Sequence, residues 1–191
     1  MHTHKWFLLS LGLFLLVIAF TLPGFSLANS ISASSTGEVL ETKTIATSTI
    51  IYLTNKDREL FGMALLIPNS TLEKAAQMKA EDMAKKGYFS HNSPECSTPE
   101  KINCKTPWYY FDKAGYDFNY AGENLAVDFT EAGQIENAWM NSPTHKANIV
   151  SKNYSEVGIG IAYGTYKGRP TTFVVQLFGT KALKTLALGT R

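Results

Sequence analysis

WMNSPTHKANI, residues 139–149, contains the end of one helix and the beginning of another. Before it, apolar residues recur at the i, i+3 and i+4 spacing of a helical face, so a helix is predicted from about Glu131. Pro143 stops that helix, and Ser142 followed by Pro143 is typical of an N-cap and a first helical position. The stretch therefore predicts two consecutive helices, with His145 in the first turn of the second.

Another helix is predicted near the start of the globular region, over residues 48–62. The pattern leaves Arg58 and Glu59 outside its apolar face, and residues 65–68 are expected to continue as a buried extended or irregular run. The residues expected on the buried face are Ile50, Leu53, Leu60 and Phe61.

The helix predicted over residues 71–86 has the clearest end signals in the chain. Ser70 and Glu73 form a capping-box pattern at its start, and Gly87 stands where a left-handed C-cap belongs. Its expected apolar stripe consists of Leu72, Ala76, Ala80 and Met83.

The rest of the chain combines one more short helix with extended segments. A helix is predicted over residues 107–114, a loop follows up to Tyr120, and residues 122–126 lead towards the next helix. The β-branched segments 157–163 and 171–178, separated by glycines, predict two antiparallel strands. Because the helices need a sheet on which to bury their apolar faces, the predicted fold class is α+β.

The N-terminus has the features of an export signal. The chain has 191 residues, which fits one domain and a targeting segment. Lys5 precedes an apolar run over residues 6–20, and Ala28 ends a small-residue site typical of peptidase cleavage. Residues 1–28 are therefore predicted to be a signal peptide, with an uncleaved membrane anchor as the alternative. In either case the remainder is expected outside the cytoplasm, secreted or at the cell envelope, with residues 29–47 as a Ser/Thr-rich linker.

Charge and cysteine usage narrow the classes of partner and site. The formal net charge is +2 without a clustered Lys/Arg stripe, which excludes nucleic acid as the expected partner. Cys96 and Cys104 lie close together in a polar segment, and an oxidising compartment would allow a local disulfide between them. Reduced surface thiols are the alternative. A zinc knuckle is disfavoured because its ligand pairs are spaced more closely.

Seven short motifs occur in order along the chain: Asn55-x-x-Arg58, Ala75-Ala76-x-x-Lys79-Ala80-x-Asp82-Met83, Tyr88-Phe89-Ser90-His91-x-Ser93-Pro94, Gly122-Glu123-Asn124-Leu125-Ala126, Trp139-Met140-x-Ser142-Pro143-x-His145-x-x-Asn148-Ile149, Glu156-x-Gly158-Ile159-Gly160 and Val175-Gln176-x-Phe178-Gly179. Together they resemble the CAP superfamily of cysteine-rich secretory proteins, antigen 5 and plant pathogenesis-related class 1 proteins, in its short bacterial branch. The resemblance covers residues 48–180 and leaves 181–191 as a tail. It implies an SCP domain, an α-β-α sandwich with helices flanking a small antiparallel sheet, in agreement with the α+β prediction.

The resemblance also implies a site. In that superfamily a cleft collects histidines and glutamates and can bind a divalent metal, usually zinc. Matched by motif, the metal residues here are His91, His145 and Glu123, so Zn²⁺ or another divalent cation is the implied cofactor. Eukaryotic members have a further glutamate where this chain has Ser142, and Glu136 is interpreted as a solvated helix charge rather than a substitute.

The chemistry of these residues allows two uses. Neutral imidazoles suit zinc, and Glu123 can be a ligand or act on metal-bound water. Without metal, Glu123 can instead fix the tautomer of one imidazole. The spacing matches no local metal motif and no G-x-S-x-G stretch is present, so no catalytic residue is assigned. Ser142, Asn124 and Tyr88 are expected to neighbour the cleft.

Three functions follow as hypotheses. The first is a binding or interaction role, in which the cleft holds a divalent metal or an apolar or lipid ligand and the partner is a lipid, a glycan or a protein outside the cytoplasm. The second is a metal-dependent hydrolase or peptidase that uses His91, His145 and Glu123. The third is a structural or adhesive extracellular module. A membrane is expected to be contacted only through the N-terminal segment, if that segment is not cleaved.

Overall fold

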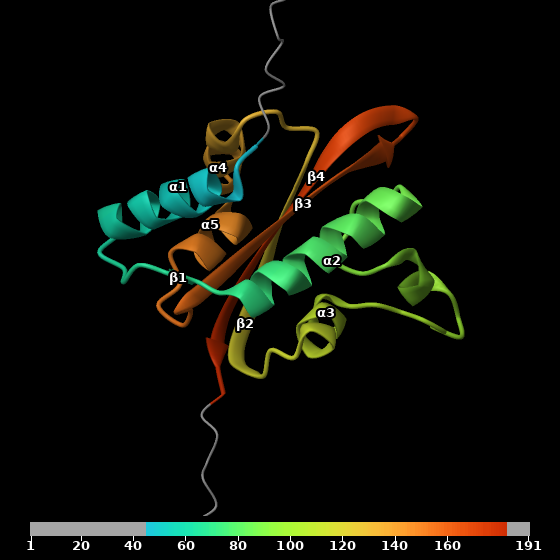
Figure 1. Ribbon diagram of the computed structural model, residues 1–191, viewed down its shortest axis with the longest axis horizontal. Coiled ribbons are helices and arrows are strands. Elements are labelled where there is room, and N and C mark those ends of the chain that lie inside the picture. The colour runs from blue at the N-terminus through green and yellow to red at the C-terminus, as the bar shows by residue number, and fades with distance from the viewer. Residues whose placement is uncertain (1–44, 183–191) are drawn as a thin grey trace, which may run out of the picture. The chain divides into compact units, whose positions relative to one another are not determined.

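Figure 1 shows the protein as a computed structural model, in which residues 45–182 are described. The predicted signal peptide, most of the predicted linker and residues 183–191 lie outside the described residues. No helix within residues 45–182 is long and apolar enough to cross a membrane. The elements are α1 (Thr47–Leu60), β1 (Ile67–Pro68), α2 (Ser70–Lys86), the 3₁₀ helix η1 (Pro94–Ser97), α3 (Pro107–Ala114), β2 (Phe118–Val127), α4 (Ala132–Met140), α5 (Pro143–Ile149), β3 (Glu156–Tyr166) and β4 (Arg169–Lys181).

The strands form one four-stranded sheet in the order β1-β3-β4-β2. β3 and β4 are antiparallel neighbours joined by a turn at Lys167 and Gly168, which confirms the predicted hairpin. At the two edges, β1 runs parallel to β3 and β2 runs antiparallel to β4, so the sheet is mixed rather than antiparallel as the resemblance implied. The loop predicted up to Tyr120 is wrong from Phe118 onward, because β2 begins there. Residues 122–126, to which no element was assigned, belong to the same strand, which pairs with β4 from Phe118 to Val127.

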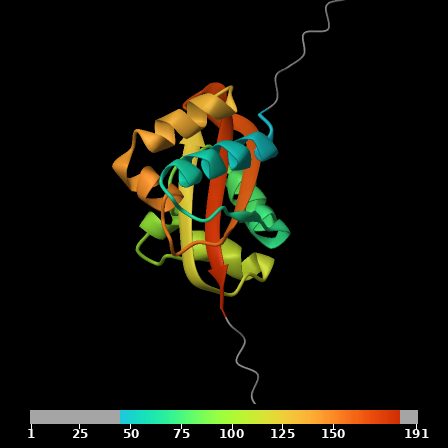
Figure 2. The same ribbon diagram turned by 90° about the vertical axis from the view of Figure 1, so that its left-hand side faces the viewer.

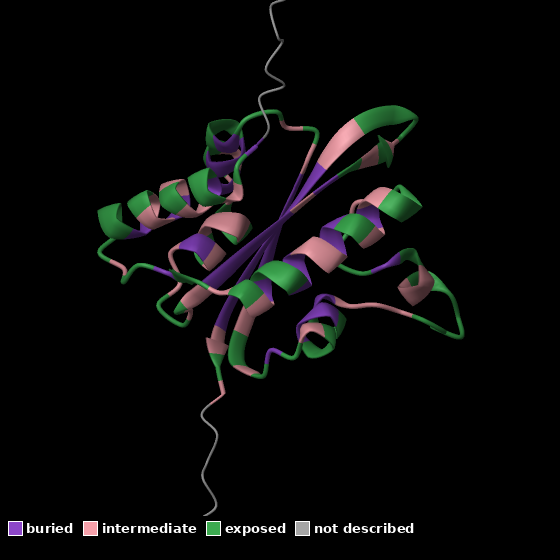
Figure 3. Ribbon diagram, in the orientation of Figure 1, coloured by how far each residue is buried: buried purple, intermediate pink, exposed green. Residues whose placement is uncertain are grey.

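Helices cover both faces of the sheet, which confirms the α+β class and the α-β-α arrangement (Figures 1 and 2). α2 and α3 pack on one face, and α1, α4 and α5 on the other. Each face has its own hydrophobic cluster, and Figure 3 shows the buried residues concentrated along the central strands and on the inward sides of the helices. The sheet therefore separates two cores, and its β2 edge lies between the two helical layers.

α2 lies close to β3 because glycines occupy the crossing points. A Cβ at Gly158 would overlap the backbone of Leu72 and Glu73, and a Cβ at Gly160 would overlap the backbone of Ala76. The close approach buries the predicted stripe completely: Leu72, Ala76, Ala80 and Met83.

The N-cap of α2 is Asn69 rather than Ser70. The Asn69 Oδ1 accepts hydrogen bonds from the N–H groups of Thr71 (2.8 Å) and Leu72 (3.1 Å). The helix consequently begins one residue earlier than predicted. It ends at Gly87 with φ +67°, as predicted for a left-handed C-cap.

The buried face of α1 was predicted correctly at Ile50, while Leu53 is only partly buried and the prediction is wrong at Leu60 and Phe61. Ile50, Thr54 and Arg58 point inward at four-residue spacing, whereas Leu60 and Phe61 are exposed. The error arises because Thr54 and Arg58 form hydrogen bonds inside the protein and occupy positions where apolar residues were expected. The buried run expected over residues 65–68 is also wrong, since only Leu66 is buried and its neighbours face outward.

Arg58 joins three chain segments through its guanidinium group. The side chain is 1% exposed, and its nitrogens donate to four carbonyl oxygens. The acceptors are Ala64 at 2.8 Å, Ile149 at 2.7 Å, Ser151 at 2.8 Å and Tyr154 at 3.3 Å. Arg58 thereby fixes the end of α5, and with it the helix that carries His145.

Candidate functional site

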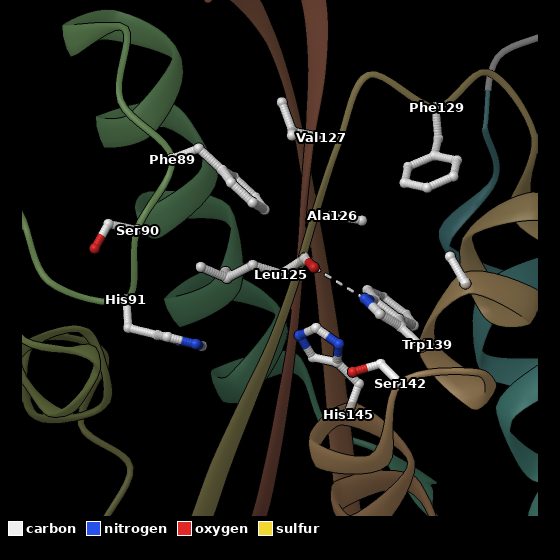
Figure 4. Close-up of a pocket in the computed structure, with 11 residues that line it drawn as sticks. Phe89, Ser90, His91, Leu125, Ala126, Val127, Phe129, Trp139, Ser142 and His145 are labelled. Atoms are coloured by element: carbon white, nitrogen blue, oxygen red, sulfur yellow. Dashed lines mark hydrogen bonds between the residues drawn. The ribbon is translucent and has the colours of Figure 1, made fainter.

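A cleft of about 480 Å³ lies along the outer edge of β2, between the two helical layers (Figure 4). Residues 125–127 of β2 form its floor, and residues 89–91, which follow α2, form one wall. The volume is that of a small-molecule or short-peptide site rather than of a packing defect. The opposite wall comes from α4, α5 and the segments that precede them: Phe129, Ala138, Trp139, Ser142 and His145.

His91 and Glu123 form a close pair at this cleft. The His91 Nδ1 lies 2.7 Å from Glu123 Oε1; the histidine side chain is 58% exposed and that of the glutamate only 3%. The hydrogen bond to Glu123 raises the pKa of His91, while burial opposes the shift. Because Nδ1 is engaged with the carboxylate, the other ring nitrogen, Nε2, is the one left for the cleft.

His145 and Ser142 lie on the wall of the cleft opposite His91. In Figure 4 the His145 ring faces the His91 ring across the cleft, with the Ser142 hydroxyl beside it. Burial lowers the pKa of His145, and the charge of His91 lowers it further. The two imidazoles therefore differ: Glu123 shifts the pKa of His91 upward, whereas burial and the charge of His91 shift that of His145 downward.

A buried lysine holds the segment that carries His91. Lys79 on α2 is 0% exposed, and its Nζ donates to the carbonyls of Ser90 (2.9 Å) and His91 (2.8 Å) and to the Tyr88 hydroxyl (3.2 Å). Burial lowers the pKa of Lys79 to about 8, against the opposing charges of Glu123 and Asp82. The role of Lys79 was not predicted, although this lysine stands at the helical spacing of the apolar stripe and that position was its available signal.

Tyr88 lies behind the His91 segment and does not line the cleft. Its hydroxyl donates to Asp82 Oδ2 at 2.8 Å. Further along, Cys96 and Cys104 form a disulfide within the loop between α2 and α3. The structure thus places Ser142 in the cleft, Tyr88 behind one wall and the cysteines in the loop that follows that wall.

Asn124, which is fully buried, ties α5 to the sheet. Its Nδ2 donates to the His145 carbonyl (3.2 Å) and to Gln176 Oε1 (3.0 Å). Asn148 donates to Asn124 Oδ1 (2.9 Å) and to the Glu123 carbonyl (3.1 Å). These bonds fix the helix carrying His145 to the strand carrying Glu123.

The network continues along this face of the sheet to Glu136 on α4. The Gln176 Nε2 donates to Thr54 Oγ1 at 2.8 Å, and the Thr54 hydroxyl donates to Glu136 Oε2 at 2.9 Å. The interpretation of Glu136 as a solvated charge is wrong, because the residue is only 4% exposed. Burial, with a smaller contribution from Asp57, raises the pKa of Glu136 to about 8.

We expect Glu136→Gln to gain stability relative to the unchanged protein as the pH rises from about 5 to about 8. In the unfolded chain this carboxyl ionises near pH 4.3, whereas the folded state keeps its proton up to about 8. Ionisation therefore favours unfolding within this window, with a slope approaching about 1.4 kcal/mol per pH unit for one proton. Urea denaturation at several pH values measures the difference.

The control for that experiment is Glu59→Gln, which removes an exposed carboxylate from the neighbouring helix α1. This variant should retain the pH trend of the unchanged protein. Parallel stability curves for the unchanged protein and Glu136→Gln would show that the buried carboxyl does not carry the pH dependence.

The side chains of the cleft could bind a metal ion only through the two imidazoles of His91 and His145. Among residues 45–182, no group of three or more His, Cys, Asp or Glu side chains is placed to hold a metal ion. His91 and His145 line the cleft, whereas Glu123 is turned toward His91 Nδ1. The carboxylate therefore occupies the position from which such groups orient metal-binding histidines.

Comparison with protein families matches residues 51–178 to the family described as CAP, Cysteine-rich secretory protein family. The chain belongs to the CAP family. The match covers well over half of the chain and includes all the residues of the cleft, so the α-β-α domain and its histidines belong to the CAP region itself.

Bacterial proteins are similar to this CAP protein. It is 33% identical over 135 residues to the uncharacterized protein YkwD of Bacillus subtilis, a match of 67% of this chain and 49% of YkwD. Among solved structures, an extracellular protein containing an SCP domain from Bacillus anthracis has a TM-score of 0.56 and 26% identity over 71% of this chain and 40% of its own. An outer surface protein of Borrelia burgdorferi has a TM-score of 0.56 and 25% identity over 71% of this chain and 92% of its own. This CAP protein thus spans about half or less of two of these relatives.

Proposed function

We propose that this CAP protein acts outside the cytoplasm and that its cleft binds a ligand with an apolar body and a polar end. The observation that carries the proposal is the division of the cleft. In Figure 4, Phe89, Val127 and Phe129 lie on one side of Leu125, and the two histidines lie with Ser142 on the other. One end offers apolar surface and the other offers hydrogen-bonding groups, the combination found in small-ligand sites.

Three observations support the extracytoplasmic location. Lys5 and the apolar run over residues 6–20 have the pattern of an export signal. The Bacillus anthracis and Borrelia burgdorferi relatives are named as an extracellular and an outer surface protein. The disulfide between Cys96 and Cys104 is a bond that persists in oxidising compartments.

A divalent metal is the second candidate for the polar end of the cleft. The His91–Glu123 pair at 2.7 Å supports it, because a carboxylate that holds one imidazole nitrogen directs the other toward a metal. His91 and His145 would hold the ion and Glu123 would orient His91. A metal such as Zn²⁺ supplies a Lewis acid that polarises a bound oxygen. With two protein ligands, such a site is expected to be weaker than a three- or four-ligand site.

The binding proposal is tested by titrating the full-chain protein with dodecanoate, which has an apolar chain and a polar end, while NMR follows the cleft residues. We expect resonance shifts at Phe89, Val127 and His145. Ala138→Phe places a ring in the cleft and should weaken binding by about tenfold or more, equivalent to about 1.4 kcal/mol. Ala147→Phe adds the same ring at an exposed position of α5 outside the cleft, and it should bind as the unchanged protein does.

Zinc as titrant in the same experiment separates the two candidates. If zinc binds the unchanged protein but neither His91→Ala nor His145→Ala, the metal site is supported. If both variants still bind zinc, the result counts against the metal site. If dodecanoate shifts no cleft resonance, or if Ala138→Phe and Ala147→Phe bind it equally, the apolar-ligand proposal fails.

A further inference from the structure

The outer edge of β2 is capped by side chains rather than by another strand. In antiparallel pairing, the N–H and C=O of one residue point to the same side, and successive residues alternate. The Asp128 N–H donates to the Thr172 carbonyl (3.0 Å), so even-numbered residues face β4 and odd-numbered residues face outward. Three outward carbonyls accept side-chain hydrogen bonds: Ala121 from the Tyr154 hydroxyl at 3.2 Å, Glu123 from Asn148 Nδ2 at 3.1 Å and Leu125 from Trp139 Nε1 at 3.0 Å.

Some of the outward-facing main-chain groups of β2 are left without a side-chain partner where this strand forms the floor of the cleft. The alternation directs the N–H of Leu125 and both the N–H and C=O of Val127 outward, and both residues line the cleft. Within residues 45–182 these three groups have no hydrogen-bond partner. Main-chain groups are strong donors and acceptors, so an unpaired row of them beside a cleft favours a ligand that has its own main chain.

We propose that the ligand of this cleft is a peptide segment in extended conformation that pairs with the outer edge of β2 at Leu125 and Val127. The inference rests on the proposed function, because it names the class of ligand for the same cleft. The bound segment continues the sheet beyond β2, between the two helical layers. Two donors and an acceptor at strand spacing match the repeating amides of a peptide, whereas an acyl chain has no such groups.

The walls of the cleft determine which side chains the bound peptide can carry. Successive side chains of a strand point to opposite faces of its sheet. On β2, Leu125 packs with the α2 layer and Ala126 packs with the layer of α1, α4 and α5. A strand bound alongside places its side chains alternately toward Phe89 on one wall and toward Phe129 and Trp139 on the other. Both walls are apolar at this end of the cleft, away from the two histidines, so the peptide recognised has consecutive apolar residues.

The inference is tested with a pool of short peptides, each carrying three variable apolar residues between charged flanks. The pool is passed over the full-chain protein, and retained peptides are measured by fluorescence anisotropy. N-methylation of the central amides of a retained peptide removes its main-chain donors, so it should weaken binding by about tenfold or more. Hydrogen exchange followed by NMR should show slower exchange of the Val127 amide when an unmethylated peptide is bound.

Val127→Pro removes one outward donor from the protein itself. That N–H does not pair with β4, and proline is tolerated in an edge strand whose N–H faces away from the sheet. We expect the peptide affinity to fall by about tenfold or more, while Ala147→Phe, at an exposed position of α5 outside the cleft, stays within about twofold. Unfolding curves establish that both variants are folded at the temperature of the measurement.

Each outcome decides one of the two proposals. A pool from which no peptide is retained overturns the inference, and so do retained peptides that are indifferent to N-methylation and to Val127→Pro. If dodecanoate still shifts the cleft resonances in that case, the proposed function stands and its ligand is a lipid. If neither probe binds in the cleft, both proposals are overturned.

Discussion

Replacement of Arg58 by methionine should lower the free energy of unfolding by about 4 kcal/mol, as judged by urea denaturation. Methionine fills similar space but leaves the carbonyls of Ala64, Ile149, Ser151 and Tyr154 without their charged donor. A buried acceptor that loses its partner costs about 1–3 kcal/mol, and water can reach only some of the four. The loop before β3 and the end of α5 should therefore loosen together.

Lys56→Met is the matched control on the same helix. It also removes one positive charge, but Lys56 is exposed, so the change should stay within about 0.5 kcal/mol. Arg58→Lys should fall between the two, because a single ammonium group cannot reach four carbonyls in different directions. A loss below about 1 kcal/mol for Arg58→Met would mean that the carbonyls find other donors and that Arg58 does not organise this region.

Gly160→Ala should cost about 3 kcal/mol or more, although it adds a single methyl group. The new Cβ would overlap the backbone of Ala76 and Gln77 in α2, and backbone cannot move aside as a flexible side chain can. Relief requires that the whole helix shift away from β3, with loss of packing along the buried stripe of α2. Thermal and urea unfolding measure the effect.

Gly133→Ala in α4 makes the same chemical change where a Cβ would meet nothing within 4 Å. It should stabilise the protein by about 0.5–1 kcal/mol, because alanine is the better helix former. The same glycine-to-alanine substitution is therefore expected to change the free energy of unfolding in opposite directions at these two positions. Equal effects at Gly160 and Gly133 would show that the close approach of α2 to β3 is not what requires glycine.

Most helices and the hairpin could be predicted because their signals are local. Gly87 and Gly115 adopt the left-handed conformation expected at the ends of α2 and α3, and Ser142 with Pro143 opens α5 as predicted. β2 was missed because its centre, Gly122, Glu123 and Asn124, consists of residues that are depleted in strands. Pairing with β4 and the side-chain bonds on its other edge stabilise this strand, and neither is visible in a local pattern.

The site could be predicted only through motifs, because its residues come from separate elements. The structure brings His91 and Glu123 to 2.7 Å and places His145 on the opposite wall, although no spacing in the chain indicates that they meet. The burial of Lys79 and Glu136 was missed for another reason. Charged residues are mostly exposed, and only tertiary partners such as the Ser90 carbonyl and Thr54 make their burial favourable.

The donors that cap the outer edge of β2 also bear on how copies of this protein behave toward one another. An uncovered edge strand is a template on which identical chains can pair and aggregate. Tyr154, Asn148 and Trp139 occupy three successive outward carbonyls, so no long run of free main-chain acceptors is available to a second copy. A short opening between two walls admits a single segment but cannot propagate a fibre, and the protein keeps an accessible strand edge without the usual risk of self-association.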